Sequence, residues 1–147
     1  MVKVQLDINS EDLNLSVSRF EKIKETVLNE TTSDLLRELK INSPHDHGRL
    51  KNSWSPNKNS DDSIIITSSA EYADWLDKGT GLYGPFKQKI YPKKGKYLSF
   101  EYEGKKIAVP WVRGIKPKKF VERSINHTKS RLDNILIKSC MKVDSQN

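Results

Sequence analysis

The spacing of apolar residues predicts the first two elements of the chain. Residues 2–8 alternate apolar and polar side chains, which is typical of a half-buried strand. From Val17 onward the apolar residues recur at intervals of three and four, which predicts one amphipathic helix over Ser16 to Lys40. The apolar stripe consists of Val17, Phe20, Ile23, Val27, Leu28, Leu35, Leu36 and Leu39. Asn42-Ser43-Pro44 predicts the end of the helix, because the residue before a proline is disfavoured in helical conformation.

The middle of the chain predicts short elements joined by loops. We expect a loop over residues 45–56 and a polar turn over residues 57–62. A β-branched run then predicts a strand over Ser63–Ser68. Residues 70–77 have the pattern of a short helix that Gly79 would terminate, and residues 79–89 read as a loop punctuated by glycine and proline.

The last third predicts a hairpin and a helix. Strands over Tyr97–Tyr102 and Lys106–Val109 flank a turn that contains Gly104. After a loop over residues 111–116, an apolar stripe predicts a last helix from Pro117 to about Lys142. The expected fold is α+β: a mainly antiparallel β-sheet packed against a long N-terminal helix and a C-terminal helix, with a short helix before a glycine-rich loop. One domain is expected over residues 1–143, followed by a disordered tail over residues 144–147.

Composition narrows the class of protein. Of the 147 residues, 35% are hydrophobic and 31% are charged, which suits one modest core. No run approaches the roughly 20 apolar residues that span a bilayer, so no membrane partner is expected. Cys140 is the single cysteine, which excludes an internal disulfide and fits a reducing cytoplasm.

Charge divides the chain into two unlike halves. Residues 1–77 carry 9 basic and 14 acidic side chains, whereas residues 78–147 carry 17 basic and 5 acidic ones. Such asymmetry indicates either an acidic partner or assembly through unlike faces. Nucleic acid is one candidate for that partner.

Candidate catalytic chemistry is sparse. His45-Asp46-His47 is the one cluster of metal-ligand types, and it lacks the third and fourth ligands of a zinc site. No serine lies in a nucleophile elbow, and Cys140 has no histidine near it in sequence. Glu71, Asp74 and Asp77 are interpreted as a solvated helix face rather than a hydrolytic pair. We therefore expect no enzyme, no metal site and no cofactor.

The basic stretches over residues 87–96 and 116–119 allow two interpretations. Lysines interleaved with Tyr91 and Tyr97 could follow a phosphate backbone and stack on bases. The alternative is a solvated loop at the rim of a protein interface.

Four segments together resemble the tail-completion, or head–tail joining, family of tailed phages. They are residues 43–54 (SPHDHGRLKNSW), 70–81 (AEYADWLDKGTG), 90–100 (IYPKKGKYLSF) and 112–121 (VRGIKPKKFV). The first resembles the family's proline and threonine-glycine-arginine-leucine element after a long helix. The departures are His47 for threonine, Asp77 for glutamate and Lys119 for proline.

The resemblance implies a virion structural protein without catalysis. Such a protein would assemble in the host cytoplasm, reside in the virion neck or upper tail, and form a ring of identical subunits. Its other partners would be a head connector or stopper and a tail terminator or tail tube protein, with DNA passing through the lumen. A monomer in solution would be compatible with this role. The alternative function is a small basic DNA- or RNA-binding protein.

The predicted interface combines glycine-rich loop, aromatic and basic residues. Large aromatics in loops are good interface anchors. The predicted interface residues are Gly79, Thr80, Gly81, Tyr83, Phe86, Lys93, Lys94, Lys96, Trp111, Lys116, Lys118 and Lys119.

Overall fold

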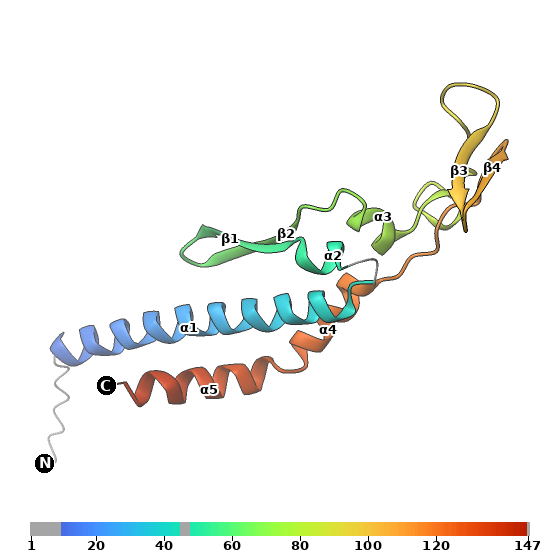
Figure 1. The fold of residues 1–147 in the computed structure, drawn as a ribbon. Helices are drawn as coiled ribbons and strands as arrows, with labels where there is room; N and C mark the ends of the chain where they lie inside the picture. Colours follow the sequence, from blue (N-terminus) through green and yellow to red (C-terminus); the bar gives the residue numbers. More distant parts are fainter. Residues whose placement is uncertain (1–9, 45–47, 147) are drawn as a thin grey trace, which may run out of the picture.

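The computed structural model describes residues 10–44 and 48–146 as a helical body from which an arm projects (Figure 1). Helix α1 (Ser10–Asn42) runs the length of the body, and helices α4 (Phe120–Lys129) and α5 (Leu132–Asp144) lie along it. The hairpin of β1 (Trp54–Ser60) and β2 (Ser63–Ser68) also contacts α1. The predicted strand over residues 2–8 and the His45–His47 cluster lie outside the described residues.

The second half of the described chain leaves the body and returns to it. Helix α3 (Ala73–Lys78) is followed by a short 3-10 turn, η1 (Gly81–Tyr83), and by the hairpin of β3 (Leu98–Tyr102) and β4 (Lys105–Val109). We call residues 79–119 the arm. In Figure 1 the arm carries β3 and β4 away from α1. The α+β class is confirmed, and the described strands form two separate two-stranded antiparallel sheets.

Several predicted elements are confirmed. Helix α1 ends at Asn42, directly before Ser43-Pro44, and β2 spans the predicted residues. The β3–β4 turn consists of Glu103 and Gly104 with φ of 50° and 75°. Positive φ at both central residues is the mark of the tight hairpin turn that matches strand twist.

The prediction of a loop over residues 45–56 and a turn over residues 57–62 was wrong for most of its length. A short helix, α2 (Arg49–Asn52), and strand β1 occupy this region. Strand β1 has the sequence WSPNKNS and is mostly exposed, so no apolar alternation marks it. It pairs with β2 alone, and such an edge position tolerates Pro56.

The prediction of one last helix starting near Pro117 was also wrong. Two helices, α4 and α5, meet at Ser130 and Arg131, where the ψ angles of −15° and −2° depart from the helical value. The Ser130 hydroxyl donates to the carbonyl oxygen of His127 at 2.7 Å, a local bond that competes with regular helix. Helix α4 begins only at Phe120, because the preceding backbone is bonded to α3.

The described core is small and lies where α2, α3 and α4 meet. Leu50, Ala73 and Phe120 are its buried centre, and Trp54 packs on Phe120 edge-to-face with ring centroids 6.2 Å apart. The Trp54 indole N–H donates to the Ser43 hydroxyl at 3.0 Å, which ties the core to the end of α1. Truncation of Phe120 to alanine in such a position costs about 3–5 kcal/mol.

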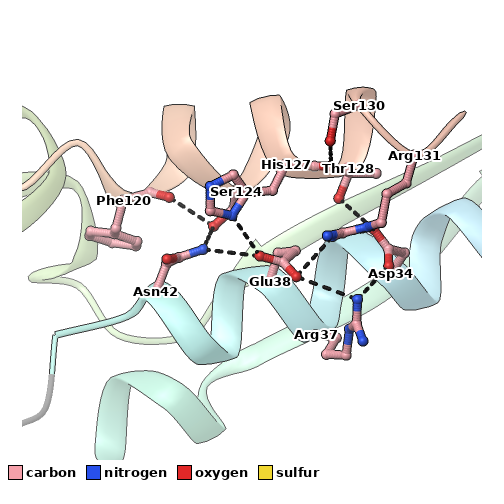
Figure 2. Close-up of polar contacts among 10 residues, drawn as sticks. All are labelled: Asp34, Arg37, Glu38, Asn42, Phe120, Ser124, His127, Thr128, Ser130 and Arg131. Carbon is pink, nitrogen blue, oxygen red and sulfur yellow. Dashed lines mark hydrogen bonds and ion pairs between the residues drawn. The ribbon is translucent and has the colours of Figure 1, made fainter.

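A polar cluster holds α1 against α4 and α5 (Figure 2). The Arg131 guanidinium contacts Asp34 Oδ2 and Glu38 Oε1, each at 2.8 Å. Thr128 donates a further hydrogen bond to Asp34 at 3.0 Å, and His127 Nδ1 donates to Glu38 Oε2 at 2.9 Å. Both carboxylates are largely buried, so their charges are compensated inside the protein.

The cluster keeps both carboxyl groups ionised. Burial alone would raise the pKa of Asp34, but hydrogen bonds from Arg131 and Thr128 outweigh it and hold the pKa below the ordinary 3.8. The hydrogen bond from His127 is the main cause that lowers the pKa of Glu38 below the ordinary 4.5, against the opposing effect of burial. A carboxyl whose folded pKa is lowered stabilises the fold above its ordinary pKa, and this stabilisation disappears as the pH falls through the folded pKa.

This cluster predicts acid sensitivity of the helical body. We expect the melting temperature of the wild type to fall between about pH 5 and about pH 3, and Glu38→Gln to show a shallower fall from a lower starting point. The measurement is thermal unfolding followed by far-UV circular dichroism across this range. Glu25→Gln, an exposed position on the same helix, is the control and should keep the wild-type slope. Equal slopes for Glu38→Gln and wild type would contradict the assignment.

Candidate assembly surface

The base of the arm is a close crossing of two chain segments. The Thr80 N–H donates to the Ile115 carbonyl at 2.9 Å, and the Leu82 N–H donates to the Arg113 carbonyl at 2.8 Å. The Ile115 N–H returns a bond to the Thr80 hydroxyl at 3.0 Å. Two of the segments that carry the family resemblance, residues 70–81 and 112–121, are thus bonded to each other.

Glycine is required where these segments cross. Gly114 has a φ of 91°, and a Cβ there would collide with the carbonyl oxygen of Thr80 and lie 2.8 Å from the Cα of Gly81. A Cβ on Gly81 would collide with the carbonyl oxygen of Arg113. The backbones approach so closely that neither position leaves room for a side chain.

Asp77 ties the arm to the body. The Lys118 and Lys119 N–H groups donate to the carbonyls of Leu76 at 2.9 Å and Asp77 at 3.2 Å. The Asp77 carboxylate then accepts the N–H of Val121 at 2.9 Å, which caps the start of α4. The interpretation of Asp77 as part of a solvated face was therefore wrong. A cap supplied from a distant helix leaves no local signal in the sequence.

An open groove with aromatic walls lies beside the crossing. It has a volume of about 410 Å³ and runs between α3 and the 79–90 segment. Trp75 and Phe86 line it, with 58% and 85% of their surfaces exposed. Large aromatic groups this exposed are typical of sites where a partner binds.

Two lysines of the arm lie over aromatic rings. Lys89 Nζ is 3.7 Å from the ring centre of Trp111, and Lys116 Nζ is 5.6 Å from that of Tyr83. These cation–π contacts orient the lysine side chains without neutralising them. The charges therefore remain available to a partner.

The arm carries many more basic than acidic side chains. Residues 79–119 contain 11 basic and 2 acidic side chains. All of these residues are described, and none of them forms a salt bridge with another described residue. A surface of this kind attracts an acidic partner.

The acidic residues of the first half whose side chains the structure describes are mostly paired within the subunit. Glu30 binds Lys142 at 2.8 Å, Asp62 binds Lys24 at 2.7 Å, and Asp34 and Glu38 belong to the buried cluster. The net negative charge of residues 1–77 therefore does not translate into a comparable unpaired acidic face on the described body. The charge complement of the arm is better sought on another molecule than on this half of the chain.

The structure separates the predicted interface residues into two groups. Gly79 is buried, and Thr80, Gly81 and Trp111 are half-buried at or near the base of the arm. The exposed group consists of Tyr83, Phe86, Lys93, Lys94, Lys96, Lys116, Lys118 and Lys119. Trp75 joins this second group at the groove.

Other functional sites find little support in the described part of the chain. Residues 10–44 and 48–146 contain no group of three or more His, Cys, Asp or Glu side chains placed to hold a metal ion. Within the same ranges no helix combines the length and apolarity needed to cross a membrane.

Comparison with known proteins agrees with the family resemblance. Residues 13–79 match the family described as "Bacteriophage HK97-gp10, putative tail-component". The matched region covers α1, the core residues Leu50 and Ala73, and α3 through Gly79. No curated protein and no solved structure gives a significant match. The chain is thus similar to a phage tail component, a structural class of protein.

The crossing predicts unequal effects for two glycine substitutions. Gly95→Ala and Gly114→Ala both place a side chain at left-handed φ, a local cost of about 1–2 kcal/mol, but a Cβ at Gly95 meets nothing within 4 Å. We expect Gly114→Ala alone to open the base of the arm. Hydrogen exchange of the amides of Thr80, Leu82 and Ile115 should accelerate at least roughly tenfold. Equal exchange in the two variants would show that the close approach does not matter.

Proposed function

We propose that this protein is a tail-completion or neck subunit, which joins the head connector to the tail tube of a phage as one member of a ring of identical copies. The observation that carries the proposal is that residues 13–79, which match a phage tail-component family, are joined to a cationic, aromatic arm whose basic residues form no salt bridge with another described residue. The role is structural and involves no catalytic step.

The ratio of surface to core supports an assembling subunit. Among the described residues, the buried apolar side chains are Leu39, Leu50, Ala73, Phe120 and Val143, and only Leu50 and Phe120 of these are fully buried. The accessible surface is 11921 Å², whereas a compact monomer of 16.9 kDa exposes about 7,700 Å². A chain that leaves this much surface exposed gains stability when neighbours cover it.

The proposed partners follow from the distribution of charge. The arm lysines meet an acidic surface of the head connector or stopper, or of the tail terminator or tube protein. The exposed aromatics Trp75, Tyr83 and Phe86 anchor that contact. Assembly takes place in the host cytoplasm, and the finished protein resides in the neck or upper tail, where DNA passes through the lumen of the ring.

Deletion of the gene tests this function. In the phage or prophage that carries it, we expect induced cells to yield DNA-filled heads lying beside separate tails, or tails with faulty ends. Negative-stain electron microscopy of the lysate and plaque counts provide the measurement. A plasmid copy of the wild-type gene should restore joined particles. Normal, infectious particles from the deletion strain would refute the neck assignment.

Direct nucleic-acid binding is the second candidate function, and the unpaired lysines of the arm favour it. If it holds, the free protein binds duplex or single-stranded DNA with submicromolar affinity, and the affinity falls steeply as salt rises. Fluorescence anisotropy with a labelled oligonucleotide at several salt concentrations measures this. Replacing Lys93, Lys94 and Lys96 with glutamine should then reduce both the affinity and the salt dependence. Weak binding even at low salt would eliminate this candidate.

A further inference from the structure

The β3–β4 hairpin has one apolar face. Its register places Leu98 opposite Val109 and Phe100 opposite Ile107, and Tyr102 continues the same face. The other face pairs Ser99 with Ala108 and Glu101 with Lys106, so it is largely polar and its charges offset each other. The hairpin is thus amphipathic, although it lies at the far end of the arm from the body (Figure 1).

This apolar face is only partly covered in the subunit, where Leu98, Ile107 and Val109 are half-buried. Phe100 is 43% exposed and Tyr102 is 60% exposed. In the described part of the chain, the two strands make extensive contact only with each other. An isolated two-stranded hairpin is marginally stable in water, so this one gains stability when another surface covers its apolar face.

The body carries an open groove whose lining is mostly apolar, like the exposed face of the β3–β4 hairpin. It has a volume of about 320 Å³ and lies between α1, the β1–β2 hairpin and α4. Apart from Thr31 and Thr32, its lining is apolar: Leu28, Leu35, Leu39, Trp54, Ile64, Ile66, Val121 and Ile125. Apolar side chains inserted here would be removed from water at about 25 cal/mol per Å².

We propose that the apolar face of the β3–β4 hairpin of one subunit docks in this groove of the next copy. The inference rests on the proposed function, because it supplies the contact that builds the ring. In Figure 1 the β3–β4 hairpin projects away from α1, the β1–β2 hairpin and α4, the elements that line the groove. The two surfaces of one chain are therefore apart, and the proposed contact forms between copies. A contact between two different patches of identical subunits is head-to-tail, and it closes into a ring when the rotation allows.

The exposed area is sufficient for such a contact on both sides. The surface of the subunit exceeds that of a compact monomer by roughly 4,200 Å². A standard interface takes about 800 Å² from each partner, so a ring member needs about 1,600 Å² for its two neighbours. The excess covers both interfaces and leaves the cationic surface of the arm for other partners.

Cross-linking of two single-cysteine variants tests the contact. In a Cys140→Ser background, one protein carries Phe100→Cys on the hairpin and the other carries Ile125→Cys at the groove. One of the two proteins carries an added tag, so that heterodimers and the two homodimers differ in mass. We mix the two proteins at high concentration, treat them with a short bifunctional maleimide, and separate the products by size. The same pair is also co-expressed and treated in cells. Heterodimers should form at least roughly ten times more efficiently than with the matched Ser99→Cys control on the opposite hairpin face.

Four cross-linking outcomes would overturn the proposal. Equal yields for the residue 99 and residue 100 variants, or no dimers in either setting, would show that the hairpin does not enter the groove. Preferential linking of two Phe100→Cys proteins would indicate a symmetric contact between hairpins. A further control is a double variant with Val4→Cys and Ile125→Cys in one chain. If this variant cross-links within the chain and no heterodimer forms, the groove belongs to the N-terminal segment of the same chain.

Complementation of the deletion strain separates this inference from the proposed function. Phe100→Asp should fail to restore joined particles, whereas Ser99→Asp should restore them, since both positions are exposed in the subunit and differ in the face they occupy. If Phe100→Asp fully restores joined particles, the docking proposal is refuted. The neck function would still stand in that case, provided that the deletion strain itself is defective. Failure of Phe100→Asp without copy-to-copy cross-links would instead assign the hairpin to a different virion protein and also refute the docking.

Discussion

The attraction between one guanidinium and two carboxylates determines how the helical body is arranged. Arg131 lies at the junction of α4 and α5 and reaches both Asp34 and Glu38 on successive turns of α1. Replacing a buried ion pair with apolar residues is often neutral or stabilising, so the pair itself is weak evidence for stability. Its effect here is geometric: it sets the register of the two C-terminal helices along α1 at the point where the helix breaks.

That register has consequences for the small core. With α4 fixed along the last turns of α1, Asn42 donates to Ser124 at 3.2 Å, and Phe120 is held at the end of α1. Phe120 then completes the cluster formed by Leu50 and Ala73. The polar cluster and the apolar core are therefore neighbouring parts of the same packing between α1 and α4. The Asp77 carboxylate caps the start of α4, at the point where the arm rejoins the body.

The sequence patterns correctly predicted the elements that are specified by residues close together in the chain. The period of the α1 stripe and the turn at Gly104 both depend on local chemistry, so they could be found from the chain alone. The break before Leu132 could not, because one serine hydroxyl bonded to the carbonyl oxygen of His127 leaves the apolar stripe of the sequence uninterrupted. Strand β1 escaped prediction for a related reason: it is exposed, and only pairing with β2 makes WSPNKNS a strand.

The sequence predicted which residues belong to the candidate site. It did not predict which of them are buried in the fold and which are exposed to a partner. The segments that carry the family resemblance meet at the joint of the molecule, by which we mean the core and the base of the arm. Leu50 and Ala73 lie in the core, and Gly81 and Gly114 form the crossing. Residues that build a joint have little surface to offer a partner. The exposed Trp75 and Phe86 and the apolar face of the hairpin have the opposite properties, since they contribute almost nothing to the isolated fold. A chain built in this way can keep the joint unchanged while its exposed surfaces adapt to whichever neighbours the particle provides.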